Sequence, residues 1–343
     1  MFKQIFIVVI VYLQSFSHSV WTFNFLGYNV NVNSLLANPY CKYTECCNDD
    51  WIKFRRNRLM RNLTNHVYGQ PLLQHAVDAL TSHFNPNFQN HKALVLSFHG
   101  MTGTGKNYVS NFIADSLYIN GVKSKYVHHF IGRLHFPDES KIPQYKEYLY
   151  NNLKAAIKDC PRQLFIFDEV DKTPPEVLNS IKPMVDYRDD VDGVNYSEAV
   201  FIFLSNIGAD VIREHFHDLY FEKGRQREDL QMIDFEFLIQ KGAFNEKGGL
   251  FHGDIIANSL IDHYIPFLPL QEEHVKKCIL NEFQIRNVNL PKPEHVEHVL
   301  KFVEWGPDES LLFAKTGCKR LSSKVALLVD KYYRHESRIH NEL

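Results

Sequence analysis

Residues 93–110, ALVLSFHGMTGTGKNYVS, constrain the fold more than any other part of this 343-residue chain. An apolar run typical of a buried strand leads into a turn with three glycines and a lysine, and then into an amphipathic segment that predicts a helix. Residues 100–107 fit the phosphate-binding pattern G-x-x-x-x-G-K, except that Asn107 stands where Ser or Thr is expected. In such a turn the backbone N–H groups form an anion nest, and the following helix adds its positive end.

The sequence therefore predicts a nucleoside triphosphate site in which Lys106 supplies a point charge for the β- and γ-phosphates. The predicted nucleotide-binding residues are Gly100, Met101, Thr102, Gly103, Thr104, Gly105, Lys106, Asn107 and Tyr108. The alternative is a glycine turn between a strand and a helix that binds nothing. Because a Ser or Thr hydroxyl normally coordinates the magnesium ion, Asn107 indicates a weaker or altered hydrolysis site, although an amide can still coordinate or hydrogen-bond.

Strands and helices alternate after this turn. We expect strands at 125–132, 164–167 and 199–204, helices at 108–117, 142–158 and 210–221, and a last strand at 264–270. Helical spacing also runs through residues 51–80, interrupted near Gly69. This alternation is typical of an α/β fold with a mostly parallel sheet flanked by helices, whose ligands lie at the carboxyl ends of the strands.

Polar side chains follow two of these strands directly. Asp168 and Glu169 come after 164–167, and Ser205 and Asn206 come after 199–204. In phosphate-loop ATPases an Asp in the first position assists magnesium, and a Glu beside it activates the attacking water. We take Asp168 and Asn107 as the magnesium candidates; the alternative is a solvated turn at the end of a buried strand.

From residue 272 the pattern changes to helices without strands, at 272–286, 294–305 and 318–333. We therefore expect a nucleotide-binding α/β domain at 51–270 and a small α-helical lid domain at 271–343. Lys319 stands at the start of the last predicted helix, from which it could reach the phosphates; otherwise it is an ordinary surface lysine.

The first 19 residues have the pattern of a secretory signal peptide: an early cation, an apolar run and small residues. The alternative is an N-terminal helix that stays attached. Residues 20–50 form an apolar, Cys-containing segment interrupted by asparagines, which could touch a membrane surface but is not expected to cross it. Two acceptor sites for N-glycosylation, Asn62 and Asn195, and a C-terminal HNEL that resembles the retrieval signal HDEL predict residence in the endoplasmic reticulum.

The charge balance and the number of cysteines limit which partners and which cysteine chemistry are expected. With 38 Lys and Arg against 40 Asp and Glu, nothing favours a nucleic-acid partner. Six cysteines in an oxidising lumen favour disulfides. For the cluster Cys41, Cys46 and Cys47 a structural bridge is favoured over a zinc site, since no fourth ligand has finger spacing; the pairing of the other three stays open.

These motifs together resemble the torsins, the endoplasmic-reticulum branch of the AAA+ ATPases related to the Clp/HSP100 type. The resemblance runs from about residue 40 to 333. It is carried by residues 100–107 (GMTGTGKN), 109–110 (VS), 134–137 (LHFP), 165–169 (FIFDE), 192–193 (DG), 201–206 (FIFLSN), 226–229 (QRED), 266–270 (PFLPL) and 317–319 (GCK).

The resemblance implies catalytic roles for four residues: Glu169 and Asp168 in the second nucleotide motif, Asn206 as the first sensor and Lys319 as the second. It also implies a redox-sensitive pair, Cys278 with Cys318, although buried unpaired cysteines are common core residues. ATP and Mg²⁺ are the implied ligands.

A homo-oligomer is also implied, together with an activator that resembles the transmembrane lamina-associated polypeptides and supplies an arginine in trans. Arg225 and Arg227 lie in a basic turn that we interpret as structural or interfacial. The implied function is an ATPase of the endoplasmic-reticulum and nuclear-envelope lumen that remodels proteins or membrane-associated complexes.

Two other classes stay open: a nucleotide-gated binding module with little hydrolysis, and a small-molecule or nucleoside kinase. A central pore loop would need an exposed aromatic after the second strand, where Phe130 and Phe136 lie.

Overall fold

The computed structural model describes residues 22–25, 28–31, 39–187, 190–306 and 310–333. The chain divides into two compact units after Cys46. In the first, strands β1 (Thr22–Phe25) and β2 (Tyr28–Asn31) pair antiparallel, and a short 3-10 helix (Pro39–Lys42) precedes a disulfide between Cys41 and Cys46. The predicted signal peptide at 1–19 and the C-terminal HNEL lie outside the described residues.

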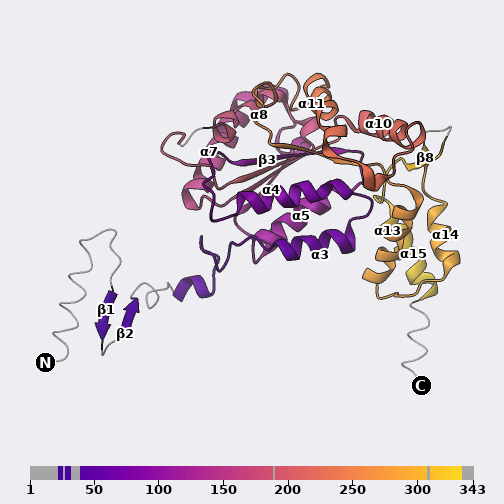
Figure 1. Ribbon diagram of the computed structural model, residues 1–343, viewed down its shortest axis with the longest axis horizontal. Helices are drawn as coiled ribbons and strands as arrows, with labels where there is room; N and C mark the ends of the chain where they lie inside the picture. Colours follow the sequence, from indigo (N-terminus) through magenta and orange to yellow (C-terminus); the bar gives the residue numbers. More distant parts are fainter. Residues whose placement is uncertain (1–21, 26–27, 32–38, 188–189, 307–309, 334–343) are drawn as a thin grey trace. The chain divides into compact units, whose positions relative to one another are not determined.

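A parallel five-stranded sheet forms the centre of the second unit (Figure 1). Its order is β4-β5-β6-β3-β7, with β3 at Leu94–Gly100, β4 at Val127–Ile131, β5 at Leu164–Asp168, β6 at Val200–Ser205 and β7 at His263–Phe267. All its pairings are parallel. The strands of the middle of the sheet are almost wholly apolar and buried, as expected for a sheet covered on both faces.

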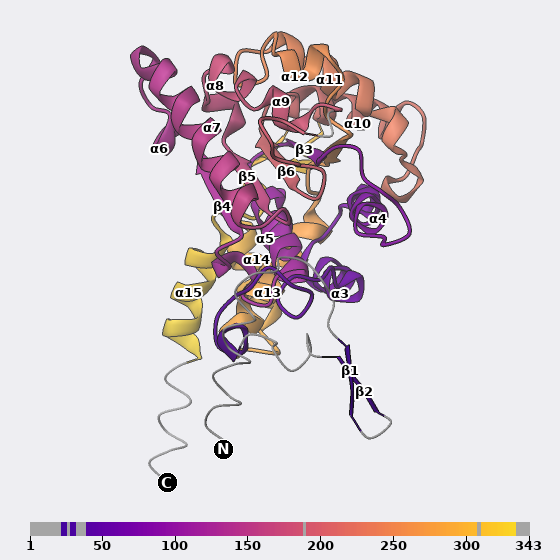
Figure 2. The ribbon, with the colours of Figure 1, turned by 90° about the vertical axis from the view of Figure 1, so that its left-hand side faces the viewer.

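Helices cover both faces of this sheet. Figures 1 and 2 show α3 and α5 on one side and α10 and α11 on the other. The helices of this part are α3 (Arg56–His66), α4 (Gln74–His83), α5 (Lys106–Leu117), α6 (Gly132–His135), α7 (Ile142–Asp159), α8 (Pro175–Asn179), α9 (Lys182–Val185), α10 (Ala209–Phe221), α11 (Glu236–Asn245) and α12 (Asp254–Ala257). The predicted α/β fold is confirmed.

The residues after β7 form a helical part with its own hydrophobic core, which we call the lid. It contains α13 (Glu272–Ile285), α14 (Pro293–Leu300) and α15 (Leu321–Tyr332). Gln271 forms a capping box at the start of α13, followed by two glutamates that suit the positive helix end. Val275, Ile279, Phe283 and Val325 are fully buried in the core that joins these helices.

The prediction of a lid without strands was wrong. A two-stranded ladder, β8 (Trp305–Gly306) with β9 (Phe313–Ala314), follows α14, so this helix ends at Leu300 and not at residue 305. The backbone N–H of Ala314 also donates to the carbonyl of Leu270 at 2.8 Å. Pairing of the backbone between non-local segments overrides the helical spacing of residues 301–305.

Helix starts also differ from prediction at two places. The helix expected from residue 51 begins only at Arg56, because Ile52 forms a bridge with Tyr118 and the next residues pair with the end of α5. The last helix begins at Leu321 and not at residue 318, because residues 315–320 form a turn, with a φ of +52° at Gly317, in which the backbone N–H of Cys318 donates to Gly103. In both places the backbone hydrogen bonds go to another segment.

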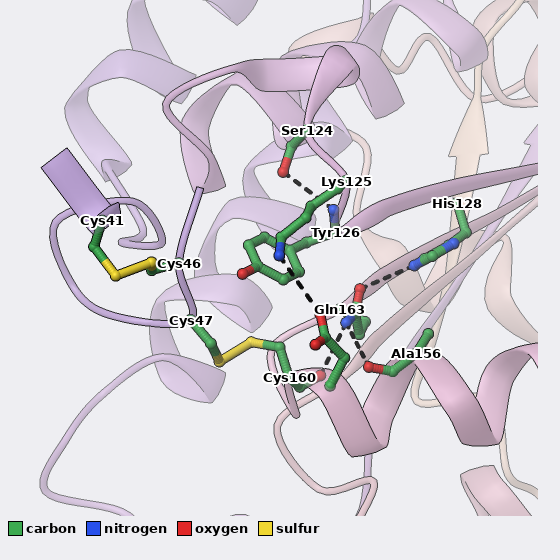
Figure 3. A network of polar contacts seen from close by, with 11 residues as sticks. Cys41, Cys46, Cys47, Ser124, Lys125, Tyr126, His128, Ala156, Cys160 and Gln163 are labelled. Atoms are coloured by element: carbon green, nitrogen blue, oxygen red, sulfur yellow. Dashed lines mark hydrogen bonds and ion pairs between the residues drawn. A yellow bond between two sulfur atoms is a disulfide. The ribbon is translucent and has the colours of Figure 1, made fainter. Parts of the chain in front are cut away.

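A second disulfide joins Cys47 to Cys160 within the large unit (Figure 3). Cys160 is fully buried at the end of α7, and beside it the Gln163 amide donates to the carbonyls of Ala156 and Cys160 at 2.7 and 3.0 Å. The bond closes a loop between residues that are 113 positions apart. Such a long loop restricts the unfolded chain strongly. In the described part of the chain no helix is long and apolar enough to span a bilayer.

Candidate functional site

The turn after β3 has the geometry of an anion nest. Gly100, Gly103 and Gly105 have φ values of +152°, +74° and +109°, which side chains with a Cβ rarely adopt. Gly105 lies directly before α5, so the loop leads into the positive end of a 12-residue helix. Backbone donors and the helix end therefore face the same space, which suits a phosphate group.

Lys106 is held at the base of this turn. Its Nζ donates to the carbonyls of Gly100 and Met101 at 2.6 and 2.9 Å, and to Asn206 Oδ1 at 3.0 Å. Burial lowers the pKa of Lys106 to about 8, against the opposing effect of the carboxylates Asp171 and Asp168. The ammonium group thus sits in a dry position with neutral partners, where an incoming phosphate would be its first anionic contact.

The acidic pair ends β5 beside the loop. Asn107 Nδ2 donates to Asp168 Oδ2, and Asp168 Oδ1 accepts from the backbone N–H of Glu169 at 2.8 Å. Glu169 has a φ of +52°, uncommon for a residue with a side chain and typical of strained functional positions. The structure thus brings both predicted magnesium candidates, Asn107 and Asp168, into direct contact.

Asn206 lies between the other two motifs because β6 lies between β3 and β5. Its side chain accepts from Lys106, and its backbone N–H donates to Asp171 Oδ1 at 3.3 Å. Asp171 is three residues beyond Asp168 and was not predicted from the sequence. It orients the backbone that presents Asn206.

The lid contacts the phosphate loop directly. The backbone N–H of Cys318 donates to the carbonyl of Gly103 at 3.0 Å. A Cβ on Gly103 would lie 2.1 Å from the Thr316 carbonyl oxygen, and one on Gly317 would lie 2.3 Å from the Gly103 oxygen. Only glycines permit this approach, which brings Lys319 to the edge of the site.

These elements enclose a cavity of about 480 Å³. Of the residues predicted from the sequence, its walls contain Thr102, Gly103, Thr104, Gly105, Lys106, Asn107, Tyr108, Asp168, Glu169, Asn206, Cys278, Cys318 and Lys319. Gly100 and Met101 do not line it; they contribute the carbonyls that hold Lys106. Glycine nests, two lysines and two carboxylates around one cavity fit a nucleoside triphosphate with its magnesium ion.

One side of the cavity was missed by the sequence reasoning. It is formed by the end of α3 and the residues after it, by Leu270 and by α13, and its residues are His66, Val67, Tyr68, Leu270, Asn281 and Glu282. His66 Nδ1 lies 3.3 Å from Asn281 Oδ1, so the wall is closed by a polar contact between α3 and the lid. In the sequence, only the interruption of the helical spacing near Gly69, shortly after the end of α3, pointed to this wall.

Two buried polar side chains support the site from behind. The Gln70 amide donates to the carbonyls of Thr104 and Leu268 at 3.3 and 2.9 Å and accepts from the Leu268 N–H at 2.8 Å. Arg227 donates to the carbonyls of Gly69 and Pro269 at 2.7 and 2.6 Å. Both hold the segment after α3 against the end of β7.

No arginine lines the cavity within the described residues. Arg227 is buried, and its guanidinium lies 4.7 Å from the Phe216 ring centroid. Arg225 forms an ion pair with Asp234 at 2.7 Å and donates to the Asp229 carbonyl at 2.5 Å. Both arginines are therefore used within the chain, in agreement with a structural role.

The structure also shows where the predicted cysteine and glycosylation sites lie. Cys278 and Cys318 form a disulfide between α13 and the turn before α15. Because Cys41, Cys46 and Cys47 are all disulfide-bonded, the zinc alternative is excluded. The glycosylation candidates lie away from the cavity: Asn62 is in α3 and Asn195 in the loop before β6.

Comparisons with known proteins agree with this geometry. The model of the Torsin family matches residues 41–167. A torsin-like protein of Drosophila melanogaster is 40% identical over 84% of this chain and 86% of its own, and one of Caenorhabditis elegans is 38% identical over 85% and 82%.

Solved structures show the same fold. The S. cerevisiae Hsp104–ADP complex aligns with a TM-score of 0.54 at 17% identity, and the closed state of Hsp104 with ATPγS and FITC-casein aligns with 0.54 at 16%. Each alignment covers 90% of this chain and 51% of the Hsp104 chain, so this chain spans about half of those chains. The fold is therefore that of the AAA+ modules, as the predicted Clp/HSP100 relation required. With relatives of such identity along most of its length, the chain belongs to the torsin family.

Proposed function

We propose that this chain is a torsin-type ATPase that binds and hydrolyses ATP in the lumen of the endoplasmic reticulum and the nuclear envelope. The observation that carries the proposal is the convergence of Lys106, Glu169, Asn206 and Lys319 on one cavity. Each comes from a different element, and each has the chemistry that phosphoryl transfer to water requires.

Each of these residues has a separate role in ATP binding or hydrolysis. Lys106 leaves its carbonyl partners for the phosphate oxygens of ATP, and Lys319 approaches them from the lid. Glu169 accepts a proton from the attacking water, which Asn206 helps to orient. Asp168 and Asn107 are the residues that would hold Mg²⁺, which neutralises developing charge on the phosphates when bound.

The absence of an arginine from the described cavity walls supports activation by a partner. An arginine supplied in trans raises phosphoryl-transfer rates by orders of magnitude. We propose that a transmembrane protein with a luminal domain, resembling the lamina-associated polypeptides, supplies it, and that the chain forms a homo-oligomer. ATP turnover drives remodelling of proteins or membrane-associated complexes, without nucleic acid.

A second candidate is a nucleotide-gated binding module. Two observations favour it. The Asn107 amide donates a hydrogen bond to Asp168, a carboxylate that would otherwise be available to Mg²⁺. Phe130 and Phe136 are buried, so neither is an exposed aromatic residue of the kind that a threading pore requires. A kinase is a weaker candidate, since a lid residue, Cys318, contacts the phosphate loop directly and an acceptor site is not evident in the described cavity walls.

The test is ATP turnover by the purified chain, alone and with the luminal domain of a candidate membrane partner. Stimulation that falls at least about 100-fold in Glu169→Gln, with ATP binding retained, supports the activated ATPase. Lys106→Ala is the control that loses binding as well. Equal turnover without the partner overturns activation in trans; binding without turnover in either condition favours the gated module, and ADP release that depends on an added acceptor favours a kinase.

A further inference from the structure

A second cavity, of about 900 Å³, lies at the opposite edge of the sheet from the nucleotide site. Its walls include His91 before β3, Arg162 before β5 and Glu198 before β6. These positions precede the strands, whereas Lys106 and Asp168 follow or end theirs. The second cavity is therefore separate from the nucleotide site, and its volume falls in the range of about 300–1,000 Å³ typical of small-ligand sites.

Aromatic faces and amides dominate the chemistry of this cavity. Phe88 is 65% exposed in its wall, which Phe84 also lines, and the amide side chains of Asn85, Gln89 and Asn90 come from the same loop. Apolar ring faces that pack on C–H groups, with amides that both donate and accept, are the combination that binds a sugar.

The two arginines at this cavity are already paired with carboxylates. Arg162 pairs with Asp49 at 2.5 Å and also donates to the Ile52 carbonyl at 3.3 Å. Arg56 lies 3.8 Å from Asp78. A neutral, hydroxyl-rich ligand therefore fits the walls better than a phosphorylated one.

One wall residue has an unsatisfied nitrogen. His83 is buried, and its Nε2 has no hydrogen-bond partner among the described residues. Burial lowers the pKa of His83 to about 4, so the ring is neutral at pH 7. A hydroxyl group is the kind of donor that would satisfy Nε2 after a small adjustment of the wall.

The glycosylation candidate Asn195 belongs to the same wall. Its side chain is exposed, and Oδ1 accepts from the backbone N–H of Ser197 at 2.7 Å, which leaves Nδ2 without a hydrogen bond in the described structure. The other candidate, Asn62, lies inside helix α3 and lines neither cavity. The structure thus distinguishes two acceptor triplets that are equivalent in the sequence.

We propose that Asn195 carries an N-linked glycan whose first N-acetylglucosamine unit lies in this cavity, against Phe88 and the 84–91 loop. The inference rests on the luminal location in the proposed function. The carbohydrate donor is a polyprenyl-pyrophosphate-linked oligosaccharide. Asn195 Nδ2 forms a bond to the anomeric carbon and loses one proton, while the bond from that carbon to the pyrophosphate oxygen breaks and the pyrophosphate leaves with its electron pair.

The first experiment expresses the full chain in animal cells and tests luminal location by protease protection of intact microsomes. Removal of N-glycans by amidase should lower the apparent mass, and Asn195→Gln should remove that shift while the matched Asn62→Gln retains it. A protected chain without a glycan on Asn195 overturns the inference and leaves the proposed location intact. A chain that is not protected overturns both.

The second experiment tests the cavity. The glycan is trimmed by endoglycosidase to one N-acetylglucosamine, and amide hydrogen exchange of residues 84–91 is compared with that of Asn195→Gln. We expect exchange at least fivefold slower in the trimmed glycoprotein, and loss of this protection in glycosylated Phe88→Ala. Equal exchange in trimmed protein and Asn195→Gln overturns the inference. ATP turnover should be the same in all these forms, because the nucleotide site lies at the other edge of the sheet.

Discussion

The backbone N–H of Cys318 donates a hydrogen bond to the carbonyl oxygen of Gly103 at 3.0 Å, so the lid and the phosphate loop share a direct contact. The same Cys318 is bonded to Cys278 on α13. A movement of α13 is therefore transmitted through one covalent bond and one hydrogen bond to the loop that surrounds the phosphates. Nucleotide affinity and the position of the lid should change together.

Gly317→Ala should weaken ATP binding at least about tenfold while the chain stays folded, because the new Cβ would lie 2.3 Å from the Gly103 oxygen and push the lid off the loop. Titration calorimetry with ATP measures this. The matched control is Gly224→Ala, which has a similar φ of +64° and nothing within 4 Å of the new Cβ. Equal affinities in the two variants would show that the close contact does not matter.

Opening the Cys278–Cys318 bond should change ATP affinity several-fold, because it frees the turn that contacts Gly103. The measurement compares ATP binding by wild type and by Cys278→Ser with Cys318→Ser, each with and without a thiol reductant. A Cys41→Ser with Cys46→Ser variant controls for the Cys41–Cys46 bond, and a Cys47→Ser with Cys160→Ser variant controls for the Cys47–Cys160 bond. If wild type responds to reductant as strongly as the Cys278/Cys318 variant does, the response comes from another disulfide.

The order of the central elements could be predicted because local pattern and tertiary role agree there. The run before Gly100 is buried for its whole length and apolar except for Ser97 and His99, as is typical of a strand covered on both faces, and the polar residues Asp168 and Asn206 mark strand ends. Strand spacing then places these side chains at one edge of the sheet. Their direct contacts, such as that of Asn107 with Asp168, depend on side-chain positions that the sequence pattern does not specify.

Features that depend on non-local backbone pairing escaped prediction. Residues 301–305 have helical spacing, yet Trp305 pairs with Ala314 in a ladder. Gln70 belongs to no recognisable motif. Its supporting role is evident only from the fold, in which its amide donates to the carbonyls of Thr104 and Leu268. The disulfide between Cys47 and Cys160 joins residues 113 positions apart, a pairing that spacing alone does not specify.

Asn107→Thr should increase ATP turnover several-fold and lower the Mg²⁺ concentration for half-maximal rate. The Asn107 amide donates to Asp168, and Thr removes this donor and replaces the amide with the hydroxyl ligand that is usual at this position of a phosphate loop. Turnover measured across a Mg²⁺ titration, with the activating partner present, checks this. Asn107→Ala is the matched control, since it frees Asp168 without adding a ligand; equal Mg²⁺ curves for Thr and Ala would exclude coordination at this position.

The stability of the fold should decrease as the pH falls from about 6.5 towards 4, partly because of His99. This residue is fully buried in β3; its ring lies 3.0 Å from the Ile207 carbonyl and 2.7 Å from the Ser97 hydroxyl, which suits a neutral ring that donates to the first and accepts from the second. Burial lowers its pKa to about 4 in the folded chain.

The unfolded chain, with a pKa near 6.5, binds the proton first, so the stability that His99 provides is complete above pH 6.5 and is lost as the pH falls through that window. The difference corresponds to ~3 kcal/mol in the free energy of unfolding. Urea unfolding of wild type and His99→Gln at several pH values measures it. Because the other titrating groups are common to both chains, the wild type should lose more stability than the variant between pH 7 and 4.5, and parallel profiles would contradict a neutral His99.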